Sequence, residues 1–301
     1  MRGVRIPRTR QTAVALTCAL VVSAGAVIGG TTIAILHRDG FDAGPAAAVA
    51  AFPPTITAQP ALIGKAAIIF DPTDGRILFQ KNADMQLPLA SITKLMTADI
   101  VLTAESPDTR VTITPSALAP EEGSGLKVGD VVTLGELLRL GLVASSNDAM
   151  QAAAESLGAN YIDRMNRTAR DLGFTETYFR NPTGLDVSAD TSGAYSSAYD
   201  VARLAALFYK QYPTLFEQTQ QSSVSIHVGD RVLTKPATAA PLLTTPGLIG
   251  AKTGYTTLAG GNLVAVFDRE IDHPLVAVVL GSTRDGRFDD MQTLISIARK
   301  N

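Results

Sequence analysis

The sequence predicts an α+β fold, in which helices flank an antiparallel sheet and an all-helical lobe stands beside it. Strand-like runs occur near both ends of the folded region, helical patterns fill the sequence between them, and one more helical pattern closes the chain. Strands separated in this way pair most simply as antiparallel neighbours, with the helical insertion packed as a second lobe. The cleft between sheet and lobe is the expected place for an active site.

The folded region is expected to begin near Leu62 with a hairpin. Residues 66–70 and 76–80 are apolar, strand-like runs, and Asp71-Pro-Thr-Asp-Gly75 between them supplies turn residues. A helix over 92–102 follows, and its first turn contains Ser91 to Lys94.

The middle of the chain, about residues 115–215, is predicted to be mostly helical. Thr133 and Glu136 form a capping box for a helix over 134–143. Further helices are expected over 148–157, 161–172 and 198–212. Strand patterns then return over 224–228, 231–234, 250–254, 262–268 and 275–280, before a last helix over 288–300.

Composition excludes several classes of function. Of the 301 residues, 46% are hydrophobic and 18% charged, which is ample for a buried core. A net charge of -2 and 6% aromatic residues give neither a basic field nor a stacking platform, so no nucleic-acid partner is expected. Cys18 is the only cysteine, and the three histidines are scattered without carboxylates at ligand spacing, so neither a disulfide nor a metal site is expected.

The N-terminal residues 1–36 are predicted to be a cytoplasmic tip followed by a transmembrane signal-anchor. Four arginines precede an uncharged, largely apolar stretch over 11–36, which is long enough for the roughly 20 helical residues that cross a bilayer. Positive charge stays on the cytoplasmic side, which places the rest of the chain outside. Ala24-Gly-Ala26 leaves the alternative of a cleaved signal and a secreted protein. Residues 37–61, rich in Ala and Pro, are interpreted as a tether to a domain over 62–301.

Three short motifs point to nucleophilic catalysis by a serine: Ser91-Ile-Thr-Lys94, Ser145-Ser-Asn147 and Lys252-Thr-Gly254. Residues three apart share one helix face, so the Lys94 amine can reach the Ser91 hydroxyl. A helix N-terminus would also favour negative charge developing on the serine oxygen. Lysine acts as a base only when burial or a nearby cation lowers its pKa, and Lys252 is the candidate cation.

A second Ser-x-x-Lys, Ser124-Gly-Leu-Lys127, competes with the first. It lies in a stretch that contains Gly123, Gly125 and Gly129, where no helix holds the lysine near the serine. Ser91 is therefore the predicted nucleophile.

With these motifs the chain resembles the penicillin-binding serine DD-peptidases of the small D-alanyl-D-alanine carboxypeptidase type. The resemblance covers about residues 62–301 and extends to residues 89–97, Asn181-Pro-Thr-Gly-Leu-Asp186, residues 198–202 and residues 259–264. It implies a β-lactamase/transpeptidase-like fold, a peptidoglycan stem peptide ending in D-Ala-D-Ala as the substrate, β-lactams as covalent inhibitors, and no cofactor.

The resemblance also implies roles for individual residues. Ser91 would attack the carbonyl between the last two D-alanines, with Lys94 as general base. Ser145 would relay the proton, and Asn147 would hold the substrate amide. The backbone NH groups of Ser91 and Tyr255 would form the oxyanion hole. The substrate would lie along Lys252, Thr253 and Gly254, and Thr253 with Arg287 would bind its terminal carboxylate. Tyr255 stands where many relatives have histidine.

Three alternatives remain at this point. A DD-endopeptidase that cuts cross-links shares every motif. A class A β-lactamase needs a Glu-x-x-Leu-Asn sequence between the second and third motifs, and none is present. A non-catalytic wall-binding homologue would have lost a motif, whereas all three are intact.

Overall fold

The structure, a computed structural model, describes residues 60–119 and 123–300. The predicted anchor over 1–36 and residues 37–59 of the predicted tether lie outside the described residues. Within the described ranges, no helix has both the length and the apolar character needed to cross a membrane.

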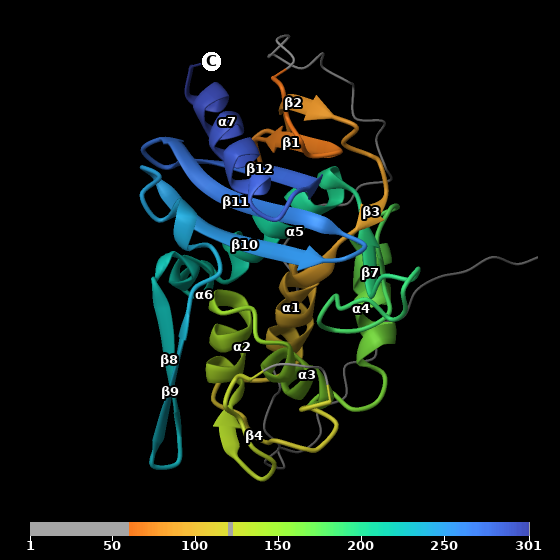
Figure 1. Ribbon diagram of the computed structural model, residues 1–301, viewed down its shortest axis with the longest axis vertical. Coiled ribbons are helices and arrows are strands. Elements are labelled where there is room, and N and C mark those ends of the chain that lie inside the picture. The colour runs from red at the N-terminus through yellow and green to blue at the C-terminus, as the bar shows by residue number, and fades with distance from the viewer. Residues whose placement is uncertain (1–59, 120–122, 301) are drawn as a thin grey trace, which may run out of the picture. The chain divides into compact units, whose positions relative to one another are not determined.

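A five-stranded antiparallel sheet occupies the upper part of the molecule in Figure 1, with the strand order β10-β11-β12-β1-β2. Its strands are β10 (Leu248–Thr256), β11 (Gly260–Glu270), β12 (His273–Ser282), β1 (Ala66–Phe70) and β2 (Ile77–Lys81). The beginning and end of the folded region meet where Ala66 pairs with Leu280 and Phe70 with Val276. This confirms the predicted sheet and leaves β10 as an edge strand.

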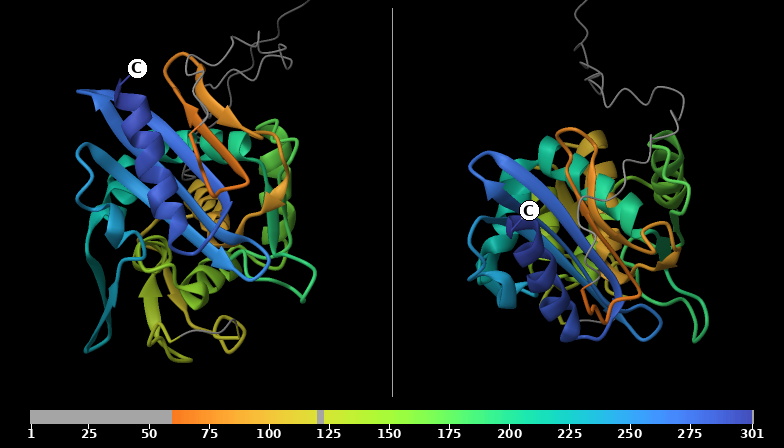
Figure 2. Two further views of the ribbon diagram at one scale, coloured as in Figure 1. Left: turned by 45° about the horizontal axis from the view of Figure 1, so that its top comes forward. Right: turned by 90° about the horizontal axis from the view of Figure 1, so that it is seen from above.

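One helix covers each face of this sheet, as Figures 1 and 2 show. They are α7 (Gly286–Lys300) and α5 (Ala198–Gln211). Successive strand residues enter different cores because side chains alternate across a sheet. Leu263 and Ala265 lie in the core cluster that includes α7 residues, whereas Val264 lies in the cluster that includes α5 residues. The expected helical lobe over about 115–215 was therefore too long, since α5 belongs to the sheet layer.

The helical lobe lies below the sheet in Figure 1. Its helices α2 (Leu134–Val143), α3 (Asn147–Glu155) and α4 (Tyr161–Asp171) surround α1 (Lys94–Ala104), which also contacts α5. The capping box at the start of α2 is confirmed, because the Glu136 NH donates to Thr133 Oγ1 and the Thr133 NH donates to Glu136 Oε2, both at 3.3 Å. Helix α1 thus lies between the lobe and the sheet and carries the first motif.

Short elements complete the fold. They are the strands β3 (Leu87–Pro88), β4 (Arg110–Thr112), β5 (Val131–Thr133), β6 (Tyr178–Phe179) and β7 (Ala194–Ser196), the hairpin β8 (Ser223–Val228) and β9 (Arg231–Pro236), helix α6 (Pro213–Glu217), and the 3-10 turns η1 (Ala90–Thr93), η2 (Gln218–Gln220) and η3 (Ala240–Leu242). Strands of two or three residues are too short to show a periodicity, so the sequence did not predict them.

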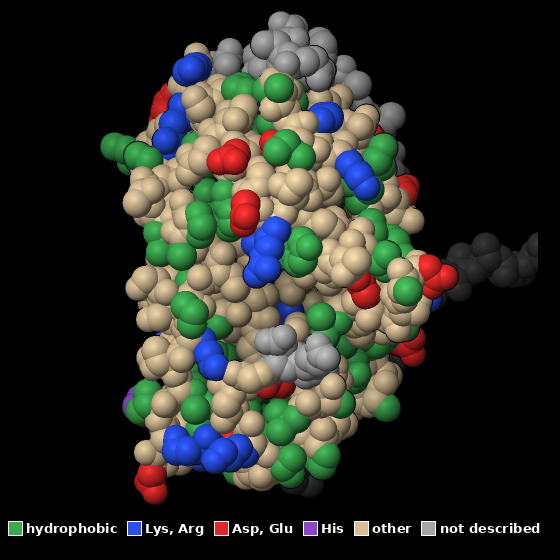
Figure 3. Space-filling view, in the orientation of Figure 1, with side chains coloured by type: hydrophobic (Ala, Val, Ile, Leu, Met, Phe, Trp, Pro, Cys, Tyr) green, Lys and Arg blue, Asp and Glu red, His purple; other side chains and the backbone are tan. Residues whose placement is uncertain are grey.

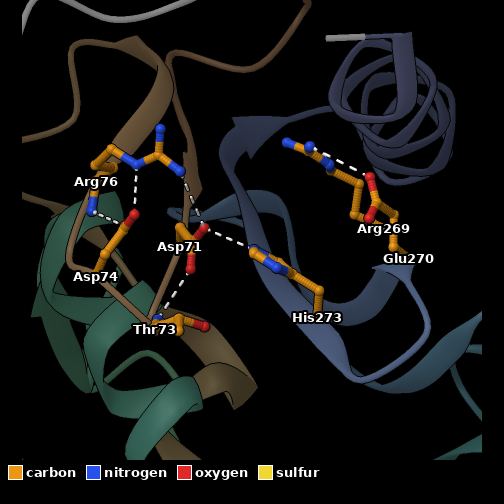
Figure 4. Close-up of polar contacts among 7 residues, drawn as sticks. All are labelled: Asp71, Thr73, Asp74, Arg76, Arg269, Glu270 and His273. Atoms are coloured by element: carbon orange, nitrogen blue, oxygen red, sulfur yellow. Dashed lines mark hydrogen bonds and ion pairs between the residues drawn. The ribbon is translucent and has the colours of Figure 1, made fainter.

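A buried aspartate links the end of β1 to the start of β12, and Figure 4 shows its contacts. Asp71, at the end of β1, accepts a hydrogen bond from the Thr73 NH (2.9 Å), and its other carboxylate oxygen lies 2.8 Å from His273 Nε2 on β12. The first turn is thereby joined to the β11–β12 hairpin. Since Asp71 is fully buried, we interpret this contact as structural.

Candidate active site

The first motif lies where η1 runs into α1. Ser91 belongs to the 3-10 turn, and the α-helix begins at Lys94, so the expected helical turn over Ser91–Lys94 is present but has 3-10 geometry. This difference hardly affects the contact between Ser91 and Lys94, because the side chains of residues i and i+3 eclipse each other in a 3-10 turn. Lys94 Nζ lies 2.6 Å from Ser91 Oγ. Ala90, directly before Ser91, has a φ of 50°, a left-handed conformation that a non-glycine residue adopts at a cost.

Lys94 is completely buried, yet its amine has three oxygen neighbours. Besides Ser91 Oγ, these are Asn147 Oδ1 at 2.7 Å and the Thr183 carbonyl at 3.1 Å. Burial lowers the pKa of Lys94 to about 7, and the negative charge of Asp148 partly opposes this shift. At neutral pH a large share of Lys94 is therefore the free amine that a general base requires.

The second motif forms the turn between α2 and α3. Ser145 has a φ of 62°, and Lys252 Nζ donates to its hydroxyl at 2.8 Å. Ser146 caps α3 by accepting the Ala149 NH (3.2 Å), which places Asn147 in the first turn of that helix. The two consecutive serines therefore have different structural roles. Ser145 faces the third motif, and Ser146 fixes the helix that carries Asn147.

The third motif lies on the edge strand β10. Lys252 is fully buried and also donates to the Thr253 carbonyl (2.8 Å). Burial first, and then the positive charges of Lys94 and Arg287, hold the pKa of Lys252 well below its usual range. The sequence predicted that the charge of Lys252 lowers the pKa of Lys94. In the structure, burial is what lowers the pKa of Lys94, and the charge of Lys94 helps to lower the pKa of Lys252. Thr253 Oγ1 donates to Thr238 Oγ1 at 2.7 Å.

Gly254 lets β10 approach the nucleophile. A Cβ at this position would lie 3.0 Å from the Leu89 carbonyl oxygen and 3.2 Å from the backbone nitrogen of Ser91. Asn262, on β11 opposite Gly254, reinforces the contact by donating to the carbonyls of Pro88 (2.9 Å) and Leu89 (3.0 Å). The first and third motifs are therefore fixed to each other through backbone groups.

Arg287, at the start of α7, reaches the same strand. Only 7% of it is exposed, and its Nη1 donates to the Gly254 carbonyl at 2.7 Å. Its Nε is buried without a hydrogen-bond partner. Tyr255, the next residue on β10, is 48% exposed. The structure therefore brings all of the predicted site residues to one place. Their catalytic and binding roles stay predictions.

Sequence reasoning missed three contributors to this site. The Thr183 carbonyl accepts from Lys94, although the sequence assigned residues 181–186 no role in the site. Asp148 follows Asn147 directly, and its negative charge raises the pKa of Lys94. Ser124 is buried and donates a hydrogen bond to Asp148. Since Ser124 is buried, a substrate cannot readily reach its hydroxyl, which supports the preference for Ser91.

Figure 3 shows a hollow on the same face, below β10, with lysine or arginine atoms inside it. Across residues 60–119 and 123–300, no group of three or more His, Cys, Asp or Glu side chains is arranged to hold a metal ion.

Comparison with known proteins agrees with this geometry. A sequence profile of Peptidase S11, described as D-alanyl-D-alanine carboxypeptidase, matches residues 54–284. The D-alanyl-D-alanine carboxypeptidase DacF of Bacillus subtilis is 30% identical over 238 residues, which cover 75% of this chain and 59% of the relative. A D-alanyl-D-alanine endopeptidase of Pseudomonas aeruginosa is 35% identical over 179 residues, which cover 56% of each protein.

Among solved structures, penicillin-binding protein D2 of Listeria monocytogenes in the ampicillin-bound form superposes with a TM-score of 0.69 at 27% identity. The match covers 80% of this chain and 99% of that one, and it confirms the expected transpeptidase-like fold. The chain spans about three fifths of the length of the curated carboxypeptidases it matches. Since the profile covers more than half of the sequence, the chain belongs to the Peptidase S11 family of D-alanyl-D-alanine carboxypeptidases.

Proposed function

We propose that this protein is a serine DD-carboxypeptidase that removes the terminal D-alanine from peptidoglycan stem pentapeptides. The observation that carries the proposal is the 2.6 Å contact between Ser91 Oγ and the buried amine of Lys94. A serine is activated when a base lies within hydrogen-bond distance and is itself unprotonated. Lys94 lies at that distance, and its lowered pKa leaves a large share of it as the free amine at neutral pH. Membership of the family supports the choice of substrate.

Acylation begins with proton transfer from the Ser91 hydroxyl to the neutral amine of Lys94. The serine oxygen forms a bond to the carbonyl carbon of the penultimate D-alanine, and the peptide bond to the last D-alanine then breaks. The proton that Lys94 took from Ser91 passes through Ser145 to the leaving nitrogen, which returns Lys94 to its free amine. The Ser145 hydroxyl lies 2.8 Å from Lys252 Nζ. We assign the oxyanion hole to the backbone NH groups of Ser91 and Tyr255.

Deacylation reverses these roles. Free D-alanine departs, and a water molecule attacks the ester carbonyl while Lys94 accepts a proton from that water. Lys94 then donates this proton to the Ser91 oxygen as its bond to the acyl group breaks, which restores the free enzyme. Thr253 and Arg287 are assigned to the terminal carboxylate of the incoming peptide, because a guanidinium forms paired hydrogen bonds with a carboxylate. Asn147, which is held by Lys94 at 2.7 Å, is assigned to the substrate amide.

β-Lactam antibiotics are the proposed covalent inhibitors. Attack of Ser91 on the lactam carbonyl opens the ring, and no leaving group departs. The ampicillin-bound relative from Listeria monocytogenes supports this assignment.

A DD-endopeptidase activity is the second candidate, and the similarity to the Pseudomonas aeruginosa endopeptidase favours it. The two reactions share the acyl-enzyme and differ in the amine that leaves. Incubation with a pentapeptide and with a cross-linked dimer, followed by chromatography of the products, distinguishes them. Release of D-alanine from the pentapeptide, abolished in Ser91→Ala and kept in Ser124→Ala, is the expected result. Dimer cleavage without D-alanine release would favour the endopeptidase.

We also propose that the N-terminal segment anchors the domain outside the cytoplasmic membrane. The support is the arginine-led apolar stretch over residues 11–36 and the Ala- and Pro-rich residues that follow it. Fractionation with carbonate washing tests this proposal. Full-length protein is expected in the membrane pellet and a variant lacking residues 1–36 in the soluble fraction, whereas recovery of full-length protein in the soluble fraction contradicts an anchor.

A further inference from the structure

Two arginines converge on the end of β10 without forming an ion pair, although the negative charge of Asp285 partly offsets the charge of Arg287. The Arg284 guanidinium carbon lies 5.4 Å from the centre of the Tyr255 ring, and Arg287 donates to the Gly254 carbonyl. No carboxylate of the described residues lies within ion-pair distance of either guanidinium. After burial, the positive charge of Arg284 is the next cause that lowers the pKa of Arg287. Such repulsion is relieved when an anion binds between or beside the two groups.

Two consecutive glycines on β11 allow Arg284 to lie close to Tyr255. Gly261 pairs with Tyr255, and a Cβ on Gly261 would lie 2.0 Å from the Thr283 carbonyl oxygen and 3.2 Å from the Arg284 nitrogen. Gly260 has a φ of 65°, and a Cβ there would lie 2.6 Å from the Ser282 carbonyl oxygen. The connection from β12 to α7 can therefore pass close over β11. That path delivers Arg284 to the exposed ring of Tyr255.

The surroundings of the two arginines differ in a way that suits recognition of an anion. Arg287 is buried, and its Nε lacks a hydrogen-bond partner. Arg284 is exposed and rests against an aromatic ring that is itself half exposed. Stacking against a ring holds a guanidinium in place while its NH groups stay available for hydrogen bonds. Arg287 is thus buried against β10, and Arg284 lies at the solvent-exposed side of the same strand.

We propose that Arg284, held by Tyr255, is a specificity-determining residue that attracts and helps to bind the free C-terminal carboxylate of the substrate. This inference rests on the proposed DD-carboxypeptidase function and extends the carboxylate site beyond Thr253 and Arg287. Because Arg284 is exposed, its effect on binding depends on ionic strength. Its action is on substrate capture, so the reacting atoms at Ser91 are untouched.

The test compares substrates with and without the charge. The rate of D-alanine or D-alaninamide release is measured for a pentapeptide ending in D-alanine and for the same peptide ending in D-alaninamide. Arg284→Ala is expected to lower kcat/KM for the acid about fivefold at low salt, mainly through KM, and to leave the value for the amide unchanged. Arg284→Lys is expected to recover part of the loss. An equal loss on both peptides, or no loss on the acid, overturns the proposal.

A second measurement does not depend on turnover of the amide. The second-order rate of acylation is measured with benzylpenicillin and with its uncharged methyl ester over a range of salt concentrations. The wild type is expected to react faster with the acid at low salt, and this preference is expected to shrink in Arg284→Ala. A preference that is the same in both proteins overturns the role of Arg284.

The ring of Tyr255 provides a matched pair of controls. Tyr255→Phe keeps the aromatic face and is expected to keep the wild-type ratio of kcat/KM for the acid to kcat/KM for the amide. Tyr255→Ala removes the ring that holds Arg284 and is expected to reproduce part of the Arg284→Ala effect. Equal behaviour of Tyr255→Phe and Tyr255→Ala contradicts the role of the ring in holding Arg284. A wild type that neither releases D-alanine nor binds penicillin overturns the proposed function itself, which is a different outcome from unchanged selectivity in active variants.

Discussion

The amine of Lys94 and the hydroxyl of Ser91 lie 2.6 Å apart at the junction of a 3-10 turn and an α-helix. The lysine is buried, and Asn147 Oδ1 and the Thr183 carbonyl complete its surroundings. Oxygen neighbours fix the position of the amine, and burial makes its charged form unfavourable. A base and a nucleophile are thus held in contact before any substrate binds.

The pH dependence of acylation is the first prediction. Burial lowers the pKa of Lys94 to about 7, so its protonated, inactive form dominates below that pH. The acylation rate with a fluorescent penicillin is expected to rise roughly tenfold per pH unit below the midpoint and to level off above it. Lys94→Arg is the matched variant, because arginine keeps the charge and cannot act as a base at these pH values. A rate that does not change between about pH 5 and 9 contradicts the role of Lys94 as base.

Asp148→Asn is expected to move that midpoint. The negative charge of Asp148 raises the pKa of Lys94 against the larger effect of burial, so its removal should shift the acidic limb of the profile to lower pH. Ser124→Ala is the control, because it removes one hydrogen bond to Asp148 and keeps the carboxylate. An identical midpoint in Asp148→Asn and the wild type means that Lys94 does not sense this charge.

Gly254→Ala is expected to slow acylation by about 10²-fold, because a small displacement of β10 from Ser91 misaligns the site. The added methyl group would lie 3.0 Å from the Leu89 carbonyl oxygen and 3.2 Å from the Ser91 nitrogen. Gly123→Ala serves as the control, since a Cβ there meets nothing within 4 Å. Wild-type acylation kinetics in Gly254→Ala would show that the close approach is unnecessary.

Asn262→Ala is expected to destabilise the fold by about 3 kcal/mol, because it leaves buried backbone groups without partners. The Asn262 side chain donates to the Pro88 and Leu89 carbonyls and accepts the Gly281 NH. Differential scanning calorimetry should show a lower Tm than the wild type. Ser225→Ala, which removes an exposed hydroxyl bond on β8, should change Tm little. Equal Tm values for the two variants contradict a structural role for Asn262.

The sequence was sufficient to predict the main sheet and the three motifs because both carry strong local signals. The five strands of the sheet contain apolar runs, and the capping box at Thr133 fixes where α2 begins. Helix α5 shows the limit of this reasoning. An amphipathic pattern reveals that a helix has an apolar face, but it does not reveal whether a sheet or other helices cover that face.

The missed parts of the site depend on contacts between residues distant in sequence. Lys94 and the Thr183 carbonyl are 89 positions apart, and a backbone acceptor carries no residue signature. Ser124 was set aside as a nucleophile, and its bond to Asp148 was not foreseen because it joins a glycine-containing loop to α3. The 3-10 geometry of residues 90–93 was also missed, since its side-chain spacing resembles that of an α-helical turn.

Mapping of the covalent penicillin adduct tests the central claim most directly. The wild-type protein is treated with penicillin and digested, and the modified peptide is sequenced by mass spectrometry, with Ser91→Ala and Ser124→Ala treated in parallel. The adduct is expected on Ser91 in the wild type and in Ser124→Ala, and no adduct is expected in Ser91→Ala. An adduct on Ser124 or Ser145, or labelling that persists in Ser91→Ala, would contradict the assignment of Ser91 and Lys94 as nucleophile and base.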